Sequence, residues 1–119
     1  MNKLTLLNRT KTYALRVIKA VQALPRDDVS TTLGRQLLRA GTSVGANYRA
    51  ACRAKSTADF VNKLKIVEEE CDESIYWMEL LIEAGLLPVR RLDALMQEGD
   101  ELLSIFVAAI KTTRAVRAS

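Results

Sequence analysis

Basic side chains of two predicted helices form stripes whose spacing suits the binding of phosphate. On the helix predicted over residues 31–53, four arginines fall within an arc of about 80° at 100° per residue, and a lysine follows the last of them. A guanidinium group binds phosphate through two parallel hydrogen bonds, and several in a row can follow a nucleic-acid backbone. The preceding helix carries a similar stripe. The predicted nucleic-acid-binding residues are Arg9, Arg16, Lys19, Arg35, Arg39, Arg49, Arg53 and Lys55.

The net charge of +4 is unevenly distributed over the 119 residues. Residues 1–55 contain 11 Lys and Arg against 2 Asp and Glu, residues 56–101 contain 4 against 12, and residues 102–119 contain 3 against none. The basic stripes therefore have two interpretations. They bind RNA or DNA through phosphates, or they are solvated or matched to the acidic helix within the fold or across a subunit contact. No aromatic side chains interleave the stripes, so stacking on single-stranded bases is not indicated.

The acidic run at residues 68–73 has carboxylates spaced four residues apart, as in the pair Glu69 and Glu73. Such pairs repel each other on a helix unless a cation or a basic side chain lies nearby. They could bind a divalent ion in a metal-dependent enzyme, or form salt bridges with arginines of the same or the next subunit. The second interpretation is favoured, because the other common metal ligand, histidine, does not occur in the sequence.

The lack of histidine also removes the Ser-His and Cys-His pairs on which much nucleophilic catalysis depends. We therefore expect a protein without catalytic residues, metal or cofactor. Cys52 and Cys71 fall on predicted apolar helix faces and are expected to behave as small buried hydrophobic side chains. No stretch approaches the roughly 20 apolar residues of a membrane span, and polar residues interrupt the first leucines too early for a signal peptide. A cytoplasmic location is expected.

Apolar residues recur at helical spacing in four segments, which must position these charges. Short connections make consecutive helices antiparallel, so the sequence predicts an all-α, antiparallel up-and-down four-helix bundle in a single domain over residues 1–119. Ser30 or Thr31 is the predicted N-cap of the second helix, Ser56 that of the third, and Gly85 the stop of the third. The predicted helices cover residues 5–24, 31–53, 57–84 and 88–113.

Several positions within the helices predict particular contacts. Gly41 and Gly45 lie one turn apart beside an apolar face, which indicates the close approach of a neighbouring helix. Ser74 lies in the core seam of the third helix and should hydrogen-bond between helices. Trp77 and Leu81 lie beside that seam and widen the apolar surface. They are therefore the predicted interface of a homo-oligomer.

Two sequence blocks together resemble a known bacterial family. The first runs from Gln36 to Arg49 and reads QLLRAGTSVGANYR. The second includes Asp59-Phe60, Lys63-Leu64 and the run EECDESIYWMELL from Glu69. They resemble the four-helix-bundle family first noticed in reading frames within intervening sequences of large-subunit ribosomal RNA genes. This family, also called the S23-type ribosomal protein family, includes the accessory variability determinant of diversity-generating retroelements.

The resemblance implies an up-and-down bundle that assembles as a ring of five subunits. In the retroelement branch it also implies a basic surface that engages nucleic acid and a reverse transcriptase. The positions that match the family are Arg39, Ser43, Asn47, Glu70, Trp77 and Glu79. One position departs from the pattern, because Ala50 stands where the family often has a glutamate. That change makes the surface more basic.

The sequence thus favours a non-enzymatic, oligomeric four-helix-bundle protein that binds nucleic acid nonspecifically as an accessory factor. The alternative is an oligomeric protein-interaction scaffold that binds no nucleic acid, in which the basic and acidic helices serve subunit contacts. Charge reversal of the arginines separates them, because it should weaken nucleic-acid binding in the first case and break the oligomer in the second.

Overall fold

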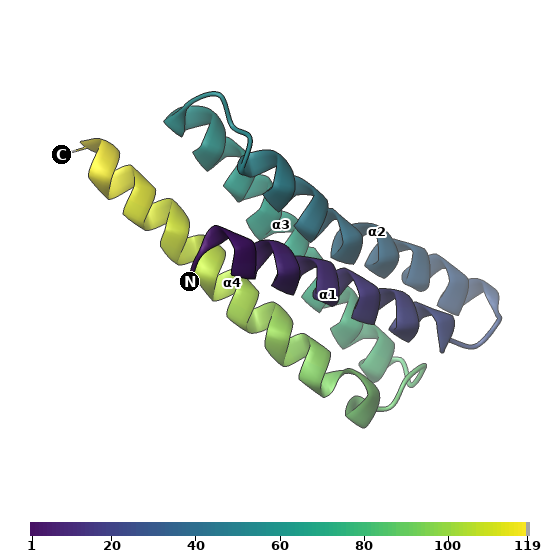
Figure 1. Ribbon diagram of the computed structural model, residues 1–119. Helices are drawn as coiled ribbons and strands as arrows, with labels where there is room; N and C mark the ends of the chain where they lie inside the picture. The colour runs from purple at the N-terminus through teal and green to yellow at the C-terminus, as the bar shows by residue number, and fades with distance from the viewer. Residues whose placement is uncertain (119) are drawn as a thin grey trace.

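Four α-helices pack side by side into an elongated bundle in the computed structural model, which describes residues 1–118 (Figure 1). Each helix contacts the next one along the chain, and the first also contacts the last. The bundle measures 51 × 21 × 21 Å along its principal axes. The predicted all-α four-helix bundle is thereby confirmed. The helices are α1 (Lys3–Gln22), α2 (Asp28–Ala51), α3 (Thr57–Glu83) and α4 (Val89–Ala118).

The helix ends are fixed by local hydrogen bonds. Ser56 is the N-cap of α3, as predicted, and its Oγ accepts from the backbone N–H of Asp59 at 3.1 Å. The predicted cap of α2 at Ser30 or Thr31 is wrong. Asp27 is the cap, because its backbone is extended and its Oδ1 accepts from the N–H of Ser30 at 2.8 Å. Gly85 follows α3 with φ +74°, the left-handed conformation expected of a glycine that ends a helix.

α4 is longer than the sequence pattern predicted. The apolar seam ends at Ile110, but the helix continues to Ala118. Residues 111–118 contain no Gly or Pro and several good helix formers, so nothing in the sequence stops the helix. The prediction of an end near residue 113 is therefore wrong, and residue 119 lies outside the described part of the chain.

The core is formed by one apolar stripe from each helix. In α3, Leu64, Val67, Cys71 and Met78 belong to this stripe and are all buried. Leu81 is fully buried as well, so its assignment to an exposed apolar strip is wrong. The physical reason is that α3 packs against both α2 and α4, and therefore buries a wider face than a single seam. Trp77 is half-buried and packs against the core.

α1 and α2 approach each other closely at the two predicted glycines. A Cβ atom at Gly41 would lie 2.7 Å from Cγ2 of Val17, and one at Gly45 would lie 3.3 Å from the backbone oxygen of Thr10. Both distances are shorter than ordinary van der Waals contact, so the small residues set the spacing of this helix pair. The prediction that a neighbouring helix packs against them is confirmed.

A buried hydrogen-bond network crosses the middle of the bundle. The hydroxyl groups of Tyr13 in α1 and Ser74 in α3 lie 2.7 Å apart, and Ser74 Oγ also donates to the backbone oxygen of Cys71 at 2.6 Å. Since Ser74 has one hydroxyl proton, Tyr13 donates to Ser74. Gly99 of α4 makes room for the phenol, because a Cβ there would lie 2.8 Å from Tyr13 Oη. The expected hydrogen bond of Ser74 between helices is confirmed.

Candidate nucleic-acid interface

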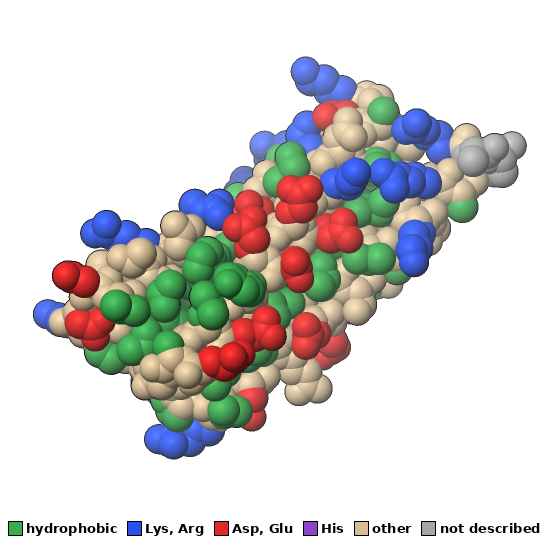
Figure 2. Space-filling view, turned by 180° about the vertical axis from the view of Figure 1, so that it is seen from behind, with side chains coloured by type: hydrophobic (Ala, Val, Ile, Leu, Met, Phe, Trp, Pro, Cys, Tyr) green, Lys and Arg blue, Asp and Glu red, His purple; other side chains and the backbone are tan. Residues whose placement is uncertain are grey.

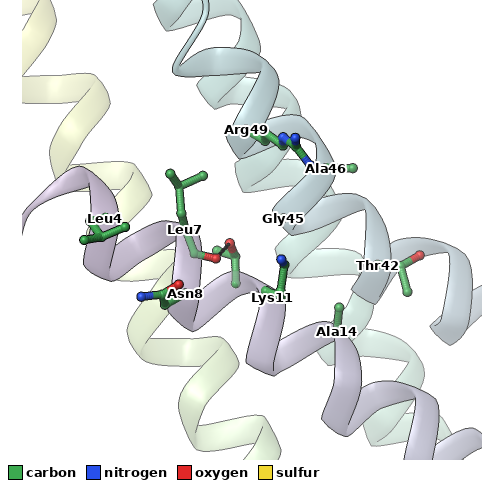
Figure 3. Close-up of a pocket in the computed structure, with 10 residues that line it drawn as sticks. Leu4, Leu7, Asn8, Lys11, Ala14, Thr42, Gly45, Ala46 and Arg49 are labelled. Carbon is green, nitrogen blue, oxygen red and sulfur yellow. Dashed lines mark hydrogen bonds between the residues drawn. The ribbon is translucent and has the colours of Figure 1, made fainter.

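A groove between α1 and α2 brings basic side chains of both helices together. Its volume is ≈ 470 Å³. Lys11 of α1 and Arg49 of α2 lie at its walls, as Figure 3 shows, and both are exposed. Small side chains leave the surface between them open. The other lining residues are Leu4, Leu7, Asn8, Thr10, Ala14, Thr42, Gly45 and Ala46.

This groove contains positive charge without compensating carboxylates. None of its lining residues is acidic, and the ion pairs found within residues 1–118 include neither Lys11 nor Arg49. Arg53 follows Arg49 by four residues, is exposed, and lies in the turn just past the end of α2, so it adds positive charge beyond this end of the groove. A chain of anionic groups could therefore follow the groove.

A second basic site lies at the other end of the same helix pair. Arg26 and Arg35 line a groove of ≈ 470 Å³ between the end of α1 and the start of α2. Asp27 and Asp28 adjoin Arg26 in the chain and offset its charge. The Lys11–Arg49 groove is therefore the stronger candidate for an anion-binding surface.

The predicted arginine stripe of α2 is divided between two sides of the helix. Arg35 and Arg49 line grooves with α1, whereas Arg39 turns toward α3. Its two terminal nitrogens lie 3.1 Å from Oε2 of Glu70 and 3.1 Å from Oε1 of Glu73. The expectation that the acidic run forms salt bridges with an arginine is confirmed for these two glutamates. Among residues 1–118 no group of three or more potential metal ligands occurs.

The predicted stripe of α1 faces α4 rather than α2. Arg9 binds Glu98 through Nε at 2.9 Å and through a second guanidinium nitrogen, and it also lies 3.7 Å from Glu101. The hydrogen bond to Glu98 raises the pKa of Arg9 further, against the opposing effect of burial. Arg16 and Lys19 line a groove of ≈ 540 Å³ with Arg91 of α4. The eight predicted residues therefore do not form one surface.

Lys11, Arg26 and Arg91 are the basic groove residues that the helix-by-helix prediction omitted. A stripe on one helix gives no information on which side of it the next helix lies. The glycines did contain the missing information, because Gly45 marks the side of α2 that α1 approaches, and Arg49 lies one turn further on. Lys11 directly follows Thr10, the residue that contacts Gly45.

The face of α3 opposite α1 has a different character. Tyr76 is 53% exposed and packs edge-on against Trp77, with ring centroids 5.3 Å apart. The Nε1 atom of Trp77 is buried and has no hydrogen-bond partner within the described residues. Figure 2, seen from behind, shows apolar side chains bordered by acidic side chains over the middle of the molecule. The assignment of Trp77 to an oligomer interface stays a prediction.

The helices and their grooves define a four-helix-bundle protein with a basic α1–α2 face and an acidic region on α3, formed by the carboxylates of residues 68–73. Residues 2–108 match the family model described as 23S rRNA-intervening sequence protein. The chain belongs to this family.

The crystal structure of a protein of unknown function from the S23 ribosomal protein family of Bacteroides thetaiotaomicron has the same fold. It is 32% identical, superimposes with a TM-score of 0.83, and covers 89% of this chain and 98% of its own. No curated protein matches the chain. No helix within residues 1–118 has the length and apolar character needed to cross a membrane.

Proposed function

We propose that this protein binds nucleic acid through its phosphate groups, without sequence preference, as a non-enzymatic accessory factor. The observation that carries the proposal is the α1–α2 groove, in which Lys11 and Arg49 face an open surface of small side chains without any carboxylate. Two cations on facing walls can contact successive phosphates of one strand, and the small residues between them let a backbone approach.

The side chains of this face support contacts to phosphate rather than to bases. Residues 1–55 contain two aromatic residues, Tyr13 and Tyr48, and both are buried. Stacking of unpaired bases is therefore unsupported here. The family's name refers to intervening sequences of 23S rRNA, which makes structured RNA the first ligand to test.

The test is fluorescence anisotropy of a labelled RNA hairpin and a labelled DNA duplex at increasing salt. The logarithm of the affinity should fall linearly with the logarithm of the salt concentration, with a slope of roughly −0.9 per phosphate contacted on duplex DNA. The double variant Lys11→Glu/Arg49→Glu should lose at least ten-fold in affinity and show a smaller slope.

The matched control is Arg90→Glu/Arg91→Glu, which makes the same charge change at two exposed positions in the first turn of α4, outside the groove. It should leave the affinity nearly unchanged. The proposal fails if the wild-type protein does not bind at low salt, or if the groove variant binds as tightly as the control.

A second candidate function is an oligomeric scaffold whose charges serve subunit contacts. One observation favours it: Tyr76 leaves an apolar surface exposed beside acidic residues. In addition, Arg9 and Arg39 are held in ion pairs within the chain, which leaves fewer of the predicted arginines for nucleic acid. A homo-oligomer, the ring of five implied by the family resemblance, would bury that surface. A reverse transcriptase as partner, and the cytoplasmic location, also stay predictions.

A further inference from the structure

The last three turns of α4 extend beyond the part of the chain that matches the family model. That match ends at residue 108, whereas α4 continues to Ala118. Residues 109–118 contain Lys111, Arg114 and Arg117 and no acidic residue. All three basic side chains are exposed, and they do not take part in the ion pairs found within residues 1–118.

Arg114 and Arg117 continue the core-facing side of α4 past the end of the core. Phe106 and Ile110 are buried. Arg114 follows Ile110 by four residues and Arg117 follows it by seven, spacings that place all of them on one side of the helix. The side of α4 that is apolar within the bundle therefore becomes basic where the bundle ends.

The α2–α3 turn adds positive charge at the same end of the molecule. α2 ends at Ala51, and the turn before Thr57 carries the exposed residues Arg53 and Lys55. Figure 1 shows this turn and the end of α4 at the same end of the bundle, and Figure 2 shows Lys and Arg side chains gathered there.

Little negative charge offsets these cations. The carboxylate of Asp59 at the start of α3 is held by Lys63 Nζ at 2.7 Å and by the backbone N–H of Lys55 at 3.0 Å. Cations gathered without partners repel one another, which indicates that an external anion compensates them. We call the set Arg53, Lys55, Lys111, Arg114 and Arg117 the basic end.

We infer that the basic end is a second phosphate-binding surface, which contacts the same nucleic acid as the α1–α2 groove. The inference rests on the proposed function. Arg53 follows Arg49 by four residues, in the turn just past the end of α2, so positive charge continues from the groove to the basic end. A nucleic acid that occupies only the groove misses the contacts of α4, whereas a longer one reaches both surfaces.

A purely structural role for these residues makes a different prediction. Basic side chains near a helix C-terminus stabilise the helix through its dipole. If that were their whole role, their loss would shorten α4 and leave nucleic-acid affinity unchanged. Binding and helix content therefore have to be measured on the same variants.

The experiment compares two labelled RNA hairpins, one with a stem of about 5 base pairs and one of about 20, which differ about four-fold in the number of stem phosphates. The variant is Arg114→Gln/Arg117→Gln, and a second variant deletes residues 111–119. The double variant should bind the long hairpin about ten-fold more weakly, with a salt slope smaller by about 2. Its affinity for the short hairpin should be unchanged.

The control Arg90→Gln/Arg91→Gln removes the same charge from the first turn of α4, and circular dichroism reports the helix content of every variant. If the long hairpin binds equally well to the double variant, while Lys11→Glu/Arg49→Glu still weakens binding, the inference fails and the proposed function stands. An equal loss for both hairpins also overturns the inference. If the wild-type protein binds neither hairpin, the inference and the proposed function both fail.

Discussion

Three ionisable side chains are buried in the core of this small bundle. The side chains of Cys71, Tyr13 and Tyr48 are buried in the core. Burial raises the pKa of Cys71 to about 12, with a further contribution from the charges of Asp72, Asp100 and Glu98. Burial likewise raises the pKa of Tyr48 to about 12, and that of Tyr13 well above its usual value. All three groups are therefore neutral in the folded protein.

These shifts predict a loss of stability at alkaline pH. In the unfolded chain a thiol ionises near pH 8.5 and a phenol near pH 10, whereas the folded groups stay protonated to higher pH. The folded state then binds more protons, so the free energy of unfolding falls as pH rises. The loss is about 1.4 kcal/mol per pH unit for Cys71 and for Tyr13, each between its unfolded and folded pKa values.

Urea unfolding at pH 7.5, 9 and 10.5 measures this loss. Cys71→Ala should be less stable than the wild type at pH 7.5, because it leaves a cavity, but its stability should fall less between pH 7.5 and 9. Tyr13→Phe should reduce the loss between pH 9 and 10.5 instead. Equal stability of the wild-type protein across the whole range would contradict the prediction.

At the level of elements, the glycines of α2 set the distance between α1 and α2. The contacts at Gly41 and Gly45 predict different changes in stability for the same substitution, glycine to alanine. Gly41→Ala places a Cβ within 2.8 Å of both methyl carbons of Val17 and 3.1 Å from its Cβ, so rotation of the valine cannot remove the clash. Overpacking costs about 1–3 kcal/mol, more than the gain of about 1 kcal/mol in helix propensity. Gly41→Ala should therefore destabilise the protein by about 1 kcal/mol.

Gly45→Ala is the matched control in the same helix. Its nearest contact is 3.3 Å, to the backbone oxygen of Thr10, so a shift of a few tenths of an ångström relieves it. The propensity gain should offset the strain, and the free energy of unfolding measured in urea should stay within about 0.5 kcal/mol of the wild type. A Gly41→Ala protein at least as stable as Gly45→Ala would show that the helices move apart freely.

The elements also show what could be predicted from the sequence. Periodicity located the four helices, and the chemistry of Ser56 and Gly85 predicted where α3 begins and ends, because these signals are local. The surroundings of the arginines could not be predicted in the same way. An arc of 80° is wide enough at 100° per residue for Arg49 to face α1 while Arg39 faces α3. Only the packing of three helices decides which cation is free.

The prediction that Leu81 lies on the surface failed for the same reason. A pattern search assigns each helix one seam, but α3 contacts two neighbours and buries both Met78 and Leu81. Likewise, Lys11 differs little in sequence from other exposed lysines. It becomes a candidate binding residue only because Thr10 packs on Gly45 and so brings α1 beside Arg49.

On the scale of the whole molecule, charge is separated between a basic α1–α2 face with its basic end and an acidic region on α3. Two copies could therefore pair the acidic region of one with a basic face of the other. Such a contact is heterologous, and it closes into a ring or grows into a filament according to its rotation. The exposed Tyr76 beside Trp77 would add apolar area to the contact.

Self-association of this kind predicts a mass above the 13.2 kDa of one chain, measured by light scattering at low salt. Glu69 and Asp72 are exposed and belong to no ion pair found within residues 1–118. Their double reversal to lysine should give a monomer, whereas reversal of Glu83 and Asp93 should leave the assembly intact. A wild-type monomer, or an assembly that survives the first reversal, would exclude this contact.

The same variants connect assembly to nucleic-acid binding. If each subunit of an assembly presents one α1–α2 groove, a long RNA can engage several grooves at once, and the effective affinity can exceed that of one groove by 10²–10⁴. The monomeric Glu69→Lys/Asp72→Lys variant gains positive charge, which by itself favours RNA. Weaker binding by this variant, despite that gain, would mean that the assembled grooves act together. Tighter binding would mean that single chains bind RNA independently and that α3 repels it.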